Sequence, residues 1–261
     1  MNDVPFSKQL PVNLEPSQRM AIEGLAIAAY LTKCNYEAIG VTVERAMRRE
    51  GDLELSFDEK LVVFSSAWSI IDRVDALRQI LWFQREYLSF KPTEAQLASI
   101  EIARQMRNAM DHPKGTIDKL ISRKKEFPIY GVIGWTWFDE TDAFKQGDGI
   151  ILKGRKLSII SISGTHHPFS INTKEVLTDE VYFPWGNLNL WAFGKRLPLD
   201  DLITLSQNLL DHLDSVTADC TAEAIKHLGE SYVPMHPSFC QTVQETFSAE
   251  HFVRVEEFQS L

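Results

Sequence analysis

The sequence predicts an α+β protein: a mainly α-helical antiparallel bundle with a small antiparallel β-sheet inserted before its last long helix. Two observations carry this prediction. Apolar residues recur at helical spacing before residue 126 and again after residue 198. Between them, residues 127–197 are rich in β-branched and aromatic residues and are interrupted by Gly, Pro and Asn, as strands and turns are.

This pattern also predicts the domain organisation. The helices on each side of the β-rich segment are long enough for a bundle, but neither set closes a core alone. We therefore expect residues 1–126 and 198–261 to form one discontinuous helical bundle. Residues 127–197 form its β-rich insertion, with four to six antiparallel strands.

The first two helices are predicted over residues 16–50 and 57–88. Asn35 and Gly40 lie inside the first segment, so it is expected to form one bent helix or two shorter ones. The second begins at a capping box, in which the Ser56 hydroxyl and the Glu59 carboxylate each accept from a free backbone N–H. Its apolar stripe consists of Leu61, Phe64, Trp68, Ile71, Val74 and Leu77.

Two further helices are predicted from capping residues, leucine spacing and helix-ending residues. Thr93 and Gln96 form a second capping-box pattern, which predicts a helix over residues 93–111. Pro113 disfavours helical geometry at the residue before it, so this helix should end at Asp111 and continue as a basic loop. Leucines repeat at three and four along residues 199–229, and Gly229 suits the end of that helix.

Composition and cysteine usage exclude several classes of protein. Of the 261 residues, 44% are apolar and 24% are charged, which is ordinary for a globular protein. The chain has no apolar run long enough to span a membrane, and its first residues lack a basic and an apolar region, so neither a membrane span nor a secretory signal is expected. Cys34, Cys220 and Cys240 are far apart, so we expect reduced thiols in a cytoplasmic protein. No metal-ligand spacing and no cofactor-binding motif is present, so neither a metal nor a cofactor is expected.

Charge is unevenly distributed along the chain. The formal net charge is −9, which disfavours broad, non-specific binding to nucleic acid. Residues 101–125 differ, because they hold seven basic residues against three acidic ones. This basic stretch is either a solvated helix end with its loop or a local surface for an anionic partner.

The same stretch contains the most specific motif of the chain. Arg107 is followed directly by Asn108 and, at the predicted end of the helix, by His112. This pattern resembles the R-x4–6-H motif of HEPN domains, in which a polar residue, often Asn, follows the Arg. In that family the motif ends a helix of a four-helix bundle, and the preceding helix often carries acidic residues like Asp72 and Asp75. The resemblance covers residues 17–125 and 199–229 and leaves out the β-rich insertion.

The resemblance implies a metal-independent endoribonuclease that acts as a homodimer, serves as a toxin or defence effector, and has an antitoxin protein as a possible partner. RNA is cleaved when its 2′-OH attacks the adjacent phosphorus. Arg107 would bind the phosphate oxygens in a fork. His112 would move a proton, as an imidazole does near neutral pH, and Asn108 would orient it or bind phosphate. The basic residues that would hold the RNA backbone are Lys114, Lys119, Arg123, Lys124 and Lys125.

Plainer interpretations stay open at this stage. Arg107 lies four residues before Asp111 and suits a surface ion pair with it, and the helix dipole favours a histidine at position 112. Asp72 and Asp75 are most simply boundary residues with a local partner. A HEPN-like scaffold that binds nucleotides or RNA without cutting them is a further possibility.

The β-rich insertion supports a different function. It holds four of the six tryptophans: Trp135, Trp137, Trp185 and Trp191. Exposed, they would make a stacking or binding platform; buried, they would fill a thin core. The alternative to the ribonuclease is therefore a non-catalytic helical binding module whose insertion recognises a protein or a small ligand.

Overall fold

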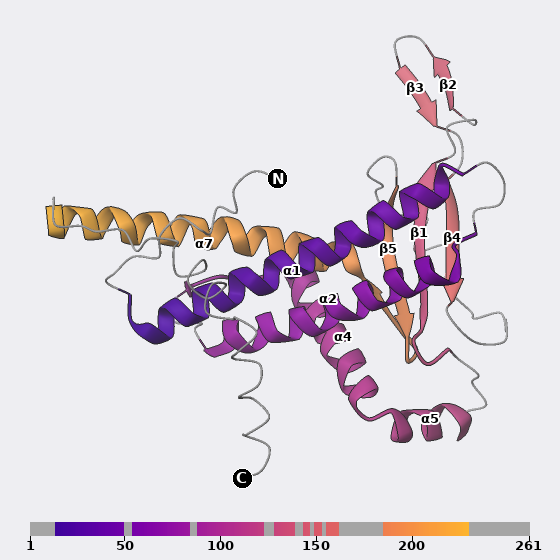
Figure 1. The fold of residues 1–261 in the computed structure, drawn as a ribbon, viewed down its shortest axis with the longest axis horizontal. Coiled ribbons are helices and arrows are strands. Elements are labelled where there is room, and N and C mark those ends of the chain that lie inside the picture. Colours follow the sequence, from indigo (N-terminus) through magenta and orange to yellow (C-terminus); the bar gives the residue numbers. More distant parts are fainter. Residues whose placement is uncertain are drawn as a thin grey trace, which may run out of the picture. The chain divides into compact units, whose positions relative to one another are not determined.

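The computed structural model confirms a mainly helical protein with an inserted antiparallel sheet (Figure 1). It describes residues 14–49, 54–83, 88–122, 128–138, 143–146, 149–152, 155–161 and 185–229. The helices are α1 (Pro16–Met47), α2 (Phe57–Phe83), α4 (Glu94–Asp111), α5 (Pro113–Ser122) and α7 (Leu199–Leu228). The strands are β1 (Val132–Phe138), β2 (Ala143–Gln146), β3 (Gly149–Leu152), β4 (Arg155–Ser161), β5 (Trp185–Ala192) and β6 (Lys195–Pro198).

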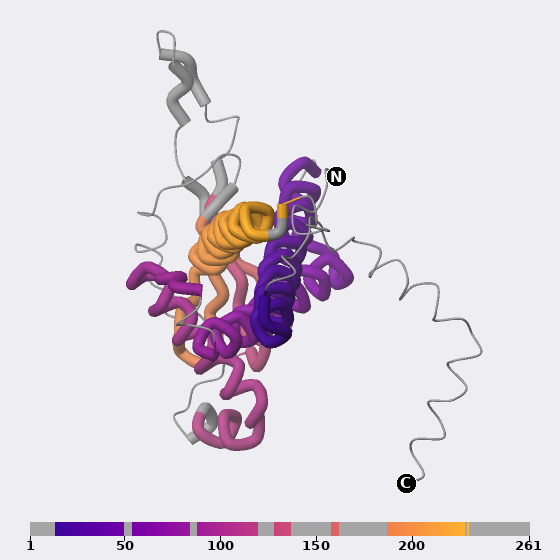
Figure 2. The backbone as a smooth tube through the Cα atoms, turned by 90° about the vertical axis from the view of Figure 1, so that its left-hand side faces the viewer, coloured from indigo at the N-terminus to yellow at the C-terminus, as the bar shows by residue number. Residues whose placement is uncertain are grey.

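The first two helices run antiparallel to each other (Figures 1 and 2). Arg49, just after α1, pairs with Glu59 in the first turn of α2. Near the other end, Gly24 lies so close to Ile80 that an added Cβ would come within 3.2 Å of its side chain. The predicted bend in α1 is not present as a break. Asn35 stays in the helix, and its side chain donates to the Leu31 carbonyl at 2.7 Å.

Both predicted capping boxes are present. The Ser56 N–H donates to Glu59 at 2.9 Å, and the Glu59 N–H donates back to the Ser56 hydroxyl at 3.3 Å. Thr93 and Gln96 make the same reciprocal pair before α4. At the far end, Gly229 has a φ of +55°, which confirms it as the glycine that ends α7.

Two details of the predicted helices were wrong. The basic loop after Asp111 begins instead with helix α5, because a proline is well tolerated in the first turn, where its missing N–H has no helical partner. In α2, Leu61 is largely exposed and Trp68 only partly buried, while Ala67 and Ile70 are fully buried. The other four residues of the predicted stripe, Phe64, Ile71, Val74 and Leu77, are buried as predicted, so the buried face of α2 keeps most of the stripe.

The predicted strands form a four-stranded antiparallel sheet in the order β4-β1-β5-β6 and a separate β2-β3 hairpin. A bulge interrupts the β1–β5 pairing: Asn187 and Leu188 of β5 stand opposite Trp135 of β1, and Asn187 has a φ of +50°. Gly131, just before β1, has a φ of +82°, and an added Cβ would lie 2.3 Å from the Trp191 carbonyl oxygen. Only glycine fits this close approach.

One hydrophobic core joins the helices to the four-stranded sheet. It includes Ile39 from α1, Ile70 from α2, Met106 from α4, Trp135 from β1 and Leu202 from α7. The start of α7 is also held by polar contacts. Tyr36 donates to Asp200, and Ser99 donates to Asp201 at 2.7 Å. The inserted segment thus supplies part of the core that the helices need.

The chain divides into two compact units. Residues 24–210 hold most of α1, the sheet, α2, α4, α5 and the start of α7. The other unit combines residues up to Glu23 with those from Asp211 onward, and its buried residues include Leu14, Ile22, Leu213 and Ala224. Among the described helices, none combines the length and the apolar character needed to cross a membrane.

Candidate functional site

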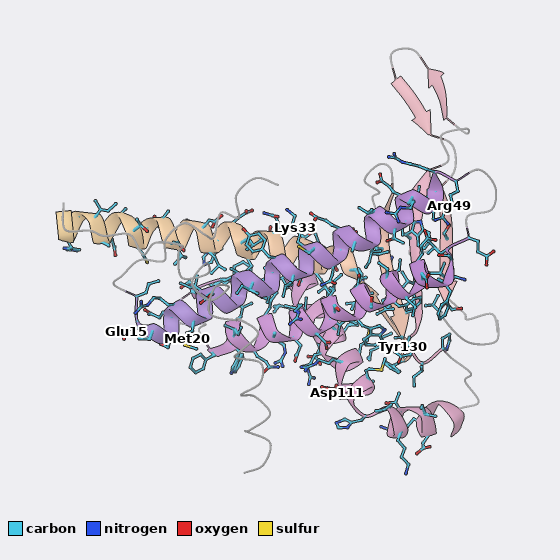
Figure 3. All side chains as sticks on the ribbon, in the orientation of Figure 1. Glu15, Met20, Lys33, Arg49, Asp111 and Tyr130 are labelled. Atoms are coloured by element: carbon cyan, nitrogen blue, oxygen red, sulfur yellow. The ribbon has the colours of Figure 1, made fainter. Side chains whose placement is uncertain are left out.

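The predicted motif lies where α4 ends and α5 begins, near the labelled Asp111 (Figure 3). His112 occupies the C-cap of α4, with φ −122° and ψ 59°, so the chain leaves helical geometry there as predicted. Thr116, in the first turn of α5, donates its hydroxyl to the carbonyls of Ala109 at 3.0 Å and His112 at 3.1 Å. These bonds satisfy carbonyls that a helix end leaves free and fix the corner between the helices. Thr116 was not among the residues predicted from the sequence to belong to this site.

Arg107 is anchored by a carboxylate on the neighbouring helix. Its Nη1 donates to Asp75 of α2, whose side chain is only 4% exposed. Asp75 also accepts from Arg78 at 2.9 Å and from Gln79 at 2.7 Å. Three donors therefore surround this buried carboxylate, which is how a buried charge is tolerated. Asp75 was expected at a boundary with a local partner; it is buried, and Arg107 joins its local partners.

The plainer alternative for Arg107, an i, i+4 ion pair with Asp111, is not among the ion pairs of the described residues. The carboxylates that pair with Arg107 are Asp75 and Asp72, both on α2. Arg107 pairs with these residues and not with Asp111 because α2 and α4 pack against each other and bring the buried Asp75 carboxylate to the guanidinium. Arg107 is 36% exposed, so one side of it remains at the surface.

The N–H groups on the Nε–Nη2 edge of Arg107 make no hydrogen bond among the described residues. Its Nε lies 3.3 Å from Asp72 Oδ1, but the two atoms are not aligned for a hydrogen bond. Within the described part of the chain, Nη2 makes no hydrogen bond either. Arg104, one turn earlier, is different. Its Nε and Nη2 donate to the two oxygens of Glu101 at 2.8 and 2.6 Å, so that fork is filled.

The other predicted site residues lie around this corner at the surface. Asn108, His112, Lys114 and Lys119 are exposed. No side-chain hydrogen bond joins Arg107 or Asn108 to His112 among the described residues. The remaining predicted RNA-binding residues, Arg123, Lys124 and Lys125, lie outside the residues that the structure describes.

The tryptophans of the insertion give little support to a binding platform. Trp135 is fully buried, and Trp191 is 8% exposed. Both belong to the interior, as expected if large side chains fill a thin core. The side chains of Trp137 and Trp185 lie outside the described part of the structure. Two of the four tryptophans that suggested a binding module are therefore not exposed for binding.

The network around Asp75 predicts a pH dependence of stability. Burial raises the pKa of this carboxyl, but hydrogen bonds from Arg78, Gln79 and Arg107 outweigh burial and hold the pKa below its usual range. A lowered folded-state pKa stabilises the protein above the unfolded-state pKa, and the contribution is lost as the pH falls through the folded value. We expect the unfolding free energy to fall more steeply between about pH 5 and pH 2 in wild type than in Asp75→Asn. Urea unfolding at stepped pH measures both slopes; parallel curves would contradict the expectation.

Comparison of the chain with protein-family models, with curated proteins and with solved structures found no match.

Proposed function

We propose that this protein is a metal-independent endoribonuclease of the HEPN type, with Arg107, His112 and Asn108 in its active site. The observation that supports this most is the state of Arg107. Asp75 fixes the guanidinium by accepting a hydrogen bond from Nη1, while the Nε–Nη2 edge of Arg107 has no hydrogen-bond partner among the described residues. A fixed, charged fork whose N–H groups are not hydrogen-bonded suits two oxygens of a phosphate.

The chemistry would use the RNA's own 2′-OH. As the O2′–phosphorus bond forms, the 2′-OH proton leaves to an imidazole, and the bond from phosphorus to the 5′-oxygen breaks as that oxygen takes up a proton. The products carry a 2′,3′-cyclic phosphate and a 5′-OH. Charge that builds on the phosphate oxygens is stabilised by Arg107. His112, which is exposed at the C-cap, would exchange protons with the bound strand.

The surroundings suit an anionic polymer. Lys114 and Lys119 are exposed on α5, directly after the motif, and the basic residues 123–125 follow in sequence. These cations would hold the backbone on either side of the cleaved bond, although the chain as a whole is acidic. The proposal thus places RNA on one local basic surface.

The proposal includes a homodimer in the cytoplasm, in which the α4 ends of two copies form one cleft. Each copy would then supply one His112, so that one imidazole acts as base and the other as acid. A role as a toxin or defence effector with an antitoxin protein as partner belongs to the same proposal. It rests on the resemblance of the Arg107–His112 motif.

The proposal is tested by RNA cleavage in EDTA. Wild type is expected to cut some members of a diverse RNA set, and His112→Ala to be at least about a hundredfold slower, as loss of a general acid–base group is. His227→Ala is the matched control, because His227 is also an exposed histidine near a helix end, on α7. It should cleave at the wild-type rate. Equal rates for both histidine variants, or no cleavage by folded wild type, would reject the proposal.

A further inference from the structure

The three nitrogens of Arg107 are not equivalent. Nη1 is held by Asp75, which is nearly inaccessible and bound by two further donors. Nε and Nη2 form the side of the guanidinium that can grip two oxygens of one anion. That side is faced by Asp72, whose side chain is 62% exposed.

Asp72 holds this side weakly. Its approach to Nε, at 3.3 Å, lacks hydrogen-bond geometry, and Nε is left buried without a hydrogen-bond partner among the described residues. A charge-assisted bond from a guanidinium is normally about 2.7–2.9 Å long. Glu101, on the same helix, shows a fully bonded fork, because its two carboxylate oxygens accept hydrogen bonds from both Nε and Nη2 of Arg104. Asp72 therefore covers the Arg107 fork without satisfying it.

We propose that Asp72 is a displaceable occupant of the Arg107 fork and that a phosphate of the RNA backbone replaces it. The exchange rests on the proposed function and adds the step by which substrate gains access to Arg107. The exposed Asp72 side chain can turn into water at little cost, while Asp75 keeps the guanidinium in place. The phosphate then receives the two N–H groups that Asp72 leaves incompletely bonded.

Competition between the two anions has a measurable consequence: Asp72 weakens RNA binding, and it does so through the fork. A double-mutant cycle isolates this effect. The four proteins are wild type, Asp72→Asn, Arg107→Lys and the double variant. Arg107→Lys keeps the positive charge but removes the fork. The probe is a fluorescent RNA oligonucleotide with 2′-O-methyl groups, which binds but cannot be cleaved by 2′-OH attack.

Fluorescence anisotropy is expected to give a Kd about three- to tenfold lower for Asp72→Asn than for wild type, the size of effect of a charge pair near the surface. In the Arg107→Lys background, the same substitution should change Kd less than about twofold. Asp111→Asn is the matched control. The charge of Asp111 acts on Arg107 at least as strongly as that of Asp72, but Asp111 makes no ion pair with Arg107 among the described residues. Asp111→Asn should therefore give the smaller change in Kd if contact with the fork, and not charge alone, limits RNA binding.

Two results would overturn this inference without touching the proposed function. One is an unchanged Kd for Asp72→Asn. The other is an equal decrease in Kd for Asp72→Asn in the wild-type and the Arg107→Lys background. The second would mean that removing any nearby carboxylate favours RNA. If wild type cleaves RNA while either result holds, the proposed function survives without the exchange. If wild type neither cleaves nor binds RNA, the proposed function fails, and this inference fails with it.

Discussion

Replacing Arg107 by lysine is expected to slow RNA cleavage about a hundred- to a thousandfold, the usual cost of losing one donor to a developing oxyanion. Lysine keeps the charge but cannot offer two parallel N–H groups to the phosphate. It also cannot remain on Asp75 and reach the substrate with a second nitrogen. Single-turnover cleavage in EDTA measures the chemical step separately from product release.

Arg104→Lys is the matched control for this prediction. Arg104 lies one turn earlier on α4 and has a similar exposure, 38% against 36%, but its fork is filled by Glu101. We expect its cleavage rate to stay within about twofold of wild type, as surface substitutions away from a site do. An equal loss in both variants would mean that α4 contributes general positive charge, and the role assigned to Arg107 would be wrong.

The largest effect on stability is expected from Asp75→Ala. It removes the common acceptor of Arg78, Gln79 and Arg107 and leaves two guanidinium groups without their carboxylate. Removing one partner of a buried pair costs about 3–5 kcal/mol. Because both arginines are more than a third exposed and can turn to water, we expect about 3 kcal/mol, the lower end of that range.

Asp72→Ala provides the comparison. Asp72 contacts the same arginine from the same helix, but it is exposed, and exposed ion pairs contribute about 0–1 kcal/mol. Urea unfolding followed by circular dichroism gives both values. Similar losses of unfolding free energy for the two variants would show that the buried network around Asp75 does not hold α2 against α4.

Local signals in the sequence predicted the helices well. Ser56 and Thr93 identify helix starts because each can cap with a residue three positions later, and Gly229 marks a helix end because it adopts a positive φ. The end of α4 before His112 followed from the proline after it. These features depend on residues within one turn of each other, so the sequence alone contains them.

Features that depend on packing were not predictable in the same way. The true partner of Arg107 is Asp75, 32 positions earlier, and not the nearby Asp111. Only the packing of α2 on α4 decides between them. Pro113 is compatible both with the end of one helix and with the first turn of the next, so helix α5 was missed. Trp135 is buried because the sheet shares its core with the helices, and Trp191 is buried outside that core, where its ring lies over Gly134 of β1; the composition of the insertion revealed neither arrangement.

The identity of the RNA ends produced in EDTA tests the central claim most directly. Mass spectrometry of the fragments from wild type is expected to find 2′,3′-cyclic phosphates with matching 5′-OH ends, and an RNA with 2′-deoxy nucleotides at the cleavage sites should stay intact. Arg107→Ala, folded as judged by circular dichroism, should give neither product. Fragments with 3′-OH ends, or cleavage of the 2′-deoxy strand, would contradict attack by the 2′-OH and with it the mechanism proposed for Arg107 and His112.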